Sequence, residues 1–164
     1  MISMPSGKTH LKIEAILLVV LLGVVTLLAV HSRVNWQQAL LFLGSYVFSM
    51  FLMSPDLDLS KSDAFLRWGL LRWMWFPYAW TFRHRQISHH PLLGPLSRIL
   101  YIGILVLVPT WIYLVSTGNP SPRLMLPVNV LLPVFVGLYM PNIEHIVADR
   151  ISTAYRRKRR RRQL

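Results

Sequence analysis

The chain has 164 residues, of which 54% are hydrophobic and 15% charged, and its 18 Lys and Arg outweigh 6 Asp and Glu to give a net charge of +12. This composition argues against an ordinary soluble globule and favours one membrane domain over residues 1–164. Because the chain has no cysteine, disulfides and thiolate metal sites are excluded, and any metal must be held by imidazole nitrogen and carboxylate oxygen.

Four apolar stretches are long enough to cross a bilayer, whose hydrocarbon core takes roughly 20 residues of helix. We expect spans at about 13–31, 36–54, 97–116 and 124–143. The first is predicted to be an uncleaved span, because Val30 and His31 stand where a signal peptide needs small residues. Pro133 and Pro141 predict a kink in the fourth. The predicted fold class is all-α, an integral membrane bundle of four transmembrane helices.

Basic residues concentrate on one side of these spans. Four spans place both termini and the central loop together, and that side holds all but two of the 18 Lys and Arg, the exceptions being Arg33 and Arg123. Because cytoplasmic loops are enriched in Lys and Arg, we expect a multi-pass protein of an inner membrane, plasma or thylakoid, with both termini in the cytoplasm. The basic tail, 150–164, is expected to contact anionic lipid headgroups, and no nucleic acid is expected as a partner.

The central loop is rich in aromatic residues. Residues 62–82 contain four Trp together with Arg67 and Arg72, and Ser60 and Asp63 stand at capping-box spacing just ahead. We expect one interfacial amphipathic helix in the cytoplasmic loop, with its rings towards acyl chains and its guanidinium groups towards phosphates. Two roles stay open for it, an aromatic belt that anchors the protein and a lipid-binding groove.

Candidate metal ligands flank the ends of the first two predicted spans. His10 and Glu14 are four residues apart at the start of the first, so they share one helix face and can reach one ion. Asp56 and Asp58 follow Pro55 just after the second, where a turn can direct both carboxylates towards one cation. Each pair also has a simpler interpretation, as interfacial or turn residues.

The segment ahead of the third predicted span holds three histidines within nine residues. His84, His89 and His90 are expected on a loop or cap, because the following proline suits a helix start. Arg83 and Arg85 beside them are candidates for binding a substrate phosphate or a lipid headgroup.

The end of the fourth predicted span completes the set. His145 and Asp149 are again four residues apart, which allows joint ligation or a carboxylate that orients the imidazole, and Glu144 stands beside them. Together, the four segments supply nitrogen and oxygen donors at one membrane face. Such a mixed set suits a divalent transition metal, with Zn preferred over Mn or Fe.

Several short motifs carry a resemblance to a known family. They are Ser6-Gly7-Lys8-Thr9-His10, Ser54-Pro55-Asp56-Leu57-Asp58-Leu59, Arg67-Trp68-Gly69, Leu71-Arg72-Trp73, His84-Arg85 with Ser88-His89, and His145 with Asp149. On these the chain resembles bacterial, cyanobacterial-type integral-membrane metal-binding proteins, related to membrane-bound metal-dependent hydrolases. The resemblance implies as metal ligands His10, Asp56, Asp58, His84, His89, His145 and Asp149. Glu14, His90 and Glu144 are possible additional ligands. The family tends to have a glutamate where Tyr139 stands here, and Glu144 is the candidate to replace it.

Two functions from different classes follow. The first is a metal-dependent hydrolase at the cytoplasmic membrane surface, acting on a phosphoester or lipid-like substrate. The alternative is a non-catalytic scaffold or assembly protein in which the metal fastens helix ends together, with membrane lipids or unknown proteins as partners. A transporter is disfavoured, because the centres of the predicted spans contain no ionisable residue.

Overall fold

The fold is all-α, as predicted. The computed structural model describes residues 7–82, 90–118 and 127–161, and these contain helices and turns but no strand. The elements are α1 (Gly7–Val30), α2 (Trp36–Leu52), the 3-10 helix η1 (Pro55–Asp58), α3 (Asp63–Arg67), the 3-10 helix η2 (Gly69–Trp75), α4 (Phe76–Thr81), α5 (Leu93–Ser116) and α6 (Val128–Arg161).

Three helices are long and apolar enough to cross a membrane. They are the segments Thr9–Val30, Leu93–Ser116 and Val128–Tyr155. α2 is not in this set: its 17 residues span about 25 Å, against roughly 30 Å for a bilayer core. Three of the four predicted spans thus coincide with helices that are long and apolar enough to cross a membrane, while the prediction that α2 is a span stays a prediction.

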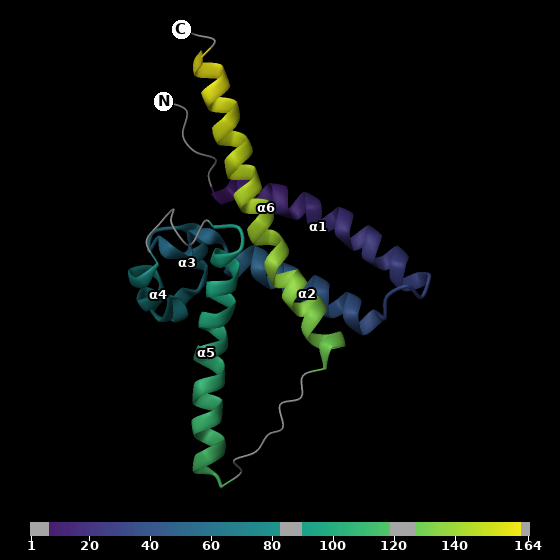
Figure 1. The fold of residues 1–164 in the computed structure, drawn as a ribbon, viewed down its shortest axis with the longest axis vertical. Helices are drawn as coiled ribbons and strands as arrows, with labels where there is room; N and C mark the ends of the chain where they lie inside the picture. Colours follow the sequence, from purple (N-terminus) through teal and green to yellow (C-terminus); the bar gives the residue numbers. More distant parts are fainter. Residues whose placement is uncertain (1–6, 83–89, 119–126, 162–164) are drawn as a thin grey trace.

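The long helices converge at one end and fan out at the other (Figure 1). α1 and α2 form a hairpin in which Asn35 caps α2, its Oδ1 accepting a hydrogen bond from the Gln37 amide at 2.9 Å. α6 crosses this hairpin, and α5 runs away from it, so the far ends of α5 and α6 are well separated (Figure 1). The arrangement is less compact than the bundle that the sequence suggested.

The closest helix contact joins α2 and α6. A Cβ atom added to Gly137 would lie 2.4 Å from the backbone oxygen of Phe42 and 2.9 Å from Cβ of Ser45, so only glycine permits this approach. Two hydrogen bonds follow one turn further on. Ser49 Oγ donates to the Leu138 carbonyl at 2.6 Å, and Asn142 Nδ2 donates to Ser49 Oγ at 3.0 Å. Glycine and these polar groups thus fix the register of α2 against α6.

α6 is longer than its apolar part. The sequence predicted a span ending near 143 followed by a basic tail, whereas α6 runs from Val128 through Pro133 and Pro141 to Arg161. Lys and Arg have high helix propensity, so the loss of hydrophobicity after 149 does not end the helix. The basic stretch projects beyond the point where the helices converge (Figure 1).

The prediction of one interfacial helix over 62–82 is wrong in form. The segment folds as α3, η2 and α4, because Gly69 has a φ of +55° and turns the chain between the first two. The N-cap of α3 is Ser62, whose Oγ accepts from the Phe65 amide at 3.1 Å, and not Ser60. Two short helices and a 3-10 turn therefore replace the continuous amphipathic face.

The segments α3, η2 and α4, which we call the aromatic block, pack around a small core that residues of η1 and α5 complete. The buried members of this core are Leu57, Ala64, Phe65, Trp75 and Tyr78, with Trp68, Phe82, Tyr101 and Ile102 packed against them. Trp75 makes ring contacts with Trp68, Tyr78 and Tyr101 at centroid distances of 5.1–5.5 Å. Only part of the aromatic set is therefore available to face acyl chains.

Candidate metal centre

α1 buries two polar residues near its start. His10 and Glu14 are each 4% exposed, although Ile16 and Val19 in the same helix are 66% and 69% exposed. Their spacing of four places them on one face, as the sequence indicated. That face is turned towards α6.

α6 presents the matching face. Asn142 and His145 are 1% and 3% exposed, and the side chain of Asp149 is 33% exposed. These positions are three and four residues apart, so they follow one stripe of the helix. A buried imidazole therefore lies between a buried amide and a half-buried carboxylate.

Two histidine–carboxylate pairs cross between α1 and α6. His10 Nε2 lies 3.1 Å from Asp149 Oδ1, and His145 Nδ1 lies 3.2 Å from Glu14 Oε1. The two imidazoles stack at a centroid distance of 3.9 Å, with an angle of 21° between their planes. A carboxylate on one ring nitrogen fixes the tautomer and the orientation of an imidazole, and this is the usual environment of a metal-binding histidine.

The donor atoms at this crossing fit a transition metal. One donor atom each of His10, His145 and Asp149 lie within 4.8 Å of one another. Ligands at about 2.1 Å around a tetrahedral ion would be about 3.4 Å apart, so small side-chain shifts suffice. His10 Nδ1 is buried without a hydrogen bond among the described residues, a costly state that a bound ion or an ordered water would relieve. The residues present therefore fit the metal that the sequence predicted.

The turn after α2 brings a further carboxylate to the crossing. Asp56 Oδ2 lies 3.7 Å from His145 Nε2, and Ser62 Oγ holds the Asp56 carbonyl by a hydrogen bond of 2.7 Å. Asp58 is 7% exposed, and neither Asp56 nor Asp58 is among the three donor residues His10, His145 and Asp149 found in the described part of the chain. Asp56 lies beside these donors through its contact with His145.

Glu144 is held by α2. The Tyr46 hydroxyl lies 2.5 Å from Glu144 Oε2 and 3.1 Å from the backbone oxygen of Glu14, so its proton can serve either acceptor. Tyr46 is fully buried and was not singled out from the sequence. It links α2 to both helices that carry the histidines. Glu144 therefore lies beside the centre as the partner of Tyr46.

The histidine-rich segment is only partly described. His84, His89, Arg83 and Arg85 lie outside the described residues. His90 is exposed, and its Nδ1 accepts hydrogen bonds from the amides of Leu92 and Leu93 at 3.3 and 3.2 Å. In this structure His90 therefore acts as a cap at the start of α5.

Tyr139 takes a structural role. Where the resembled family tends to have a glutamate, the Tyr139 hydroxyl donates to the Pro91 carbonyl at 2.7 Å. This bond joins α6 to the segment that leads into α5. The position therefore connects two helices.

Arg98 was missed as a candidate. It is fully buried near the start of α5, close enough to Asp58 and Asp56 for electrostatic attraction. From the sequence it was counted only as a basic residue on the cytoplasmic side. Its position inside the third predicted span was the available signal, because an ionisable residue within a span is by default a candidate for function.

The fold and this crossing define an all-helical protein with a histidine–carboxylate cluster suited to a metal ion. A family model described as "Uncharacterized metal-binding protein (DUF2227)" matches residues 5–159. The chain belongs to this family. The description agrees with the predicted metal binding.

Similarity to individual proteins is limited. An uncharacterized protein of Aquifex aeolicus is 47% identical over 58 residues, which are 35% of this chain and 40% of that protein. The chain thus matches less than half of the length of this relative. No solved structure matches the chain.

Proposed function

We propose that the chain is an integral membrane protein in which α1, α2, α5 and α6 all cross the bilayer. The metal centre supports this topology. His10 at the start of α1 stacks on His145, which lies 3.7 Å from Asp56 just after α2. If α1 crosses the membrane, α2 must return across it to bring Asp56 back to His10. The short α2 would then be accommodated by local thinning of the bilayer.

The centre is assigned to the cytoplasmic face of an inner membrane. The basic stretch of α6 continues from this end, and Arg33 lies at the opposite end of the α1–α2 hairpin. The excess of Lys and Arg beside the centre therefore favours the cytoplasm for both termini. The same charges would attract anionic lipid headgroups.

The proposed activity is hydrolysis of a phosphoester or similar bond in a lipid-like substrate. The observation that carries it is the crossing of His10–Asp149 and Glu14–His145 with a further carboxylate, Asp56, at its side. His10, His145 and Asp149 would hold the ion, with Zn preferred over Mn or Fe. When bound, such an ion supplies Lewis acidity to a phosphoryl oxygen and lowers the pKa of water.

Asp56 is assigned the role of general base. Its side chain is 26% exposed, whereas that of Glu14 is 6% exposed, so Asp56 is the carboxylate beside His145 that water and substrate can reach. A positioned general base contributes about 10²–10⁴-fold to a rate.

The test is turnover by the purified, metal-loaded protein in lipid nanodiscs. Phosphatidic acid, a phosphodiester lipid and a prenyl phosphate are offered, and the released product is measured. We expect turnover of at least one substrate and a loss of at least about 100-fold in Asp56→Asn. The matched control is Asp63→Asn, an exposed aspartate at the start of α3. Stoichiometric metal with no turnover of any of the three would contradict the hydrolase.

A non-catalytic scaffold is the second candidate. One observation favours it: the described donors come from α1 and α6, so an ion would fasten the two ends of the chain together. In that case chelation lowers the midpoint of unfolding while Asp56→Asn has no functional effect. If chelation or Asp56→Asn lowered turnover and neither changed the midpoint of unfolding, the non-catalytic scaffold would be excluded.

A further inference from the structure

A pocket of about 390 Å³ opens on the aromatic block, away from the residues of the metal centre. It is lined by Ser60, Phe65, Gly69, Leu70, Arg72, Trp73 and Phe76. Its volume falls in the range of small-molecule sites, about 300–1,000 Å³, which are mostly apolar with a few polar groups. None of its lining residues belongs to the histidine–carboxylate cluster. It is therefore a separate feature.

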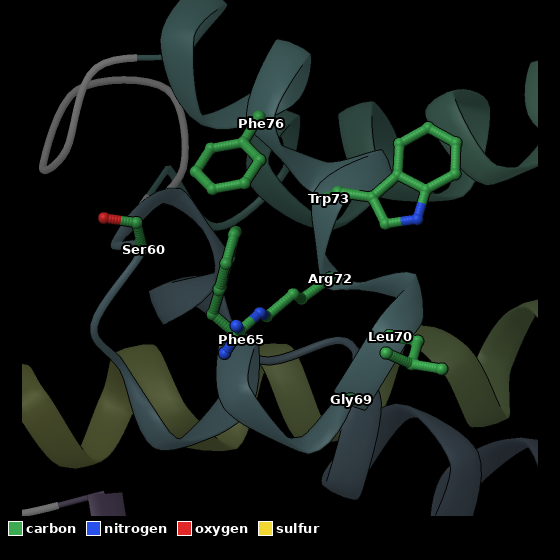
Figure 2. A pocket seen from close by; sticks show the side chains of 7 residues that line it. All are labelled: Ser60, Phe65, Gly69, Leu70, Arg72, Trp73 and Phe76. Carbon is green, nitrogen blue, oxygen red and sulfur yellow. The ribbon is translucent and has the colours of Figure 1, made fainter.

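One cation enters this pocket. Figure 2 shows the Arg72 side chain reaching across the pocket towards Phe65. Arg72 is exposed and forms no hydrogen bond or ion pair with the described part of the chain, and none of the lining residues is acidic. The pocket lining thus offers a guanidinium group with no acidic residue beside it, and its planar donors suit a phosphate.

The rim is strongly apolar. Leu70 is 91% exposed, Trp73 65% and Phe76 52%, although Phe65 at the base is 1% exposed. Trp80 and Leu71 of the same block are a further 88% and 52% exposed. Large exposed side chains at the pocket and elsewhere on the same block mark a surface that meets an apolar partner and not water. Tryptophan in particular prefers the boundary between headgroups and acyl chains.

We propose that this pocket binds an anionic phospholipid of the surrounding membrane, with the phosphate on Arg72 and the upper part of an acyl chain along Phe76, Trp73 and Leu70. Charge complementarity carries the choice, because a cation with no acid in the pocket lining favours an anionic headgroup over a zwitterionic one. The apolar rim excludes free phosphate as the main ligand, since phosphate would leave the exposed rings uncovered. The lipid-binding site goes beyond the proposed hydrolase and does not depend on that activity, but it rests on the proposed membrane location.

The test uses the full chain, delipidated in detergent. Retention of dioleoyl phosphatidylglycerol and of dioleoyl phosphatidylcholine is compared by native mass spectrometry for the wild type, Arg72→Gln and Trp73→Ala. The matched control is Arg67→Gln, in the same block but outside the pocket, whose Nη1 donates to the Phe51 carbonyl at 3.3 Å. Circular dichroism verifies the helix content of each protein.

We expect phosphatidylglycerol to bind more tightly than phosphatidylcholine, and Arg72→Gln to weaken phosphatidylglycerol about tenfold, the size of one charge-assisted hydrogen bond. Trp73→Ala should weaken both lipids, and Arg67→Gln should change neither by more than about twofold. Equal binding of the two lipids by the wild type would overturn the proposal without any variant. So would equal losses in Arg72→Gln and Arg67→Gln, or displacement of the lipid by inorganic phosphate.

Discussion

The metal-centre region and the aromatic block bury different kinds of side chain. Where α1, α2 and α6 meet, the buried residues include His10, Glu14, Ser49, Asn142 and His145, which take part in polar contacts of 2.6–3.2 Å. In the aromatic block, the buried residues are mainly rings in edge-to-face and tilted contacts. Polar contacts thus dominate the interior of the first region, and ring packing dominates the interior of the second, where hydrogen bonds of Trp68 and Tyr78 add to it. Substitutions should therefore affect the two by different mechanisms.

The largest effect is expected in the aromatic block. Trp75 is 1% exposed and touches three other rings, so Trp75→Ala should lower the free energy of unfolding by about 3–5 kcal/mol. Trp80 is 88% exposed, so Trp80→Ala should change it by less than about 0.5 kcal/mol. Equilibrium unfolding in mixed micelles measures both. Similar losses would show that the block has no core of its own.

The next effect tests the α2–α6 contact. Gly137→Ala places a methyl group 2.4 Å from the backbone oxygen of Phe42, which cannot move aside, so we expect a loss of about 1–3 kcal/mol. Gly44 in α2 has open space at the corresponding atom, and Gly44→Ala should be neutral or stabilise by up to about 1 kcal/mol through helix propensity. The same unfolding experiment applies. If both variants gain stability, the close approach of α2 and α6 is refuted.

A smaller effect is expected at the metal. Glu14→Gln keeps the shape of the side chain but removes the negative charge beside His145 Nδ1, so metal affinity should fall about 10-fold to 100-fold. Competition with a chromophoric chelator measures the affinity. Asp63→Asn serves as the control, being exposed and distant in the chain from both histidines. Equal metal affinities of Glu14→Gln and Asp63→Asn would show that Glu14 does not support the metal centre.

The smallest effect concerns one hydrogen bond. Ser49→Ala removes the donor to the Leu138 carbonyl while Asn142 still reaches that oxygen at 2.8 Å, so we expect a loss of about 1 kcal/mol. Ser116 Oγ donates to the Tyr113 carbonyl of its own helix, and Ser116→Ala should have little effect. A loss above about 3 kcal/mol in Ser49→Ala would mean that Asn142 depends on Ser49 for its position.

Hydropathy located the long helices but not their full extent or the short elements between them. α6 continues 18 residues beyond the predicted end at 143, because helix propensity outlasts hydrophobicity in its Arg-rich part. The single helix expected over 62–82 failed at Gly69, where a positive φ redirects the chain. The composition of residues 62–82 predicts that the segment is aromatic. It does not predict the turn at Gly69, because that turn depends on packing.

The sequence predicted which residues share a face of one helix, but it did not predict which side chains contact each other between two helices. The four-residue intervals placed His10 with Glu14 and His145 with Asp149, yet each histidine takes its carboxylate from the other helix. That exchange depends on how α6 crosses the α1–α2 hairpin, which Gly137 permits. Tyr46 was not predicted as part of the site for the same reason, since its hydroxyl in α2 contacts Glu144 in α6.

Metal content tests the central claim most directly. The full chain is purified in detergent, reconstituted with Zn, and compared by elemental analysis with the double variant His10→Ala/His145→Ala and with His31→Ala, whose exposed imidazole donates to the Leu27 carbonyl at the far end of α1. With helix content unchanged, we predict stoichiometric Zn in the wild type and in His31→Ala, and none in the double variant. Stoichiometric Zn in the double variant, or no Zn in the wild type, would contradict a metal centre at the crossing of α1 and α6.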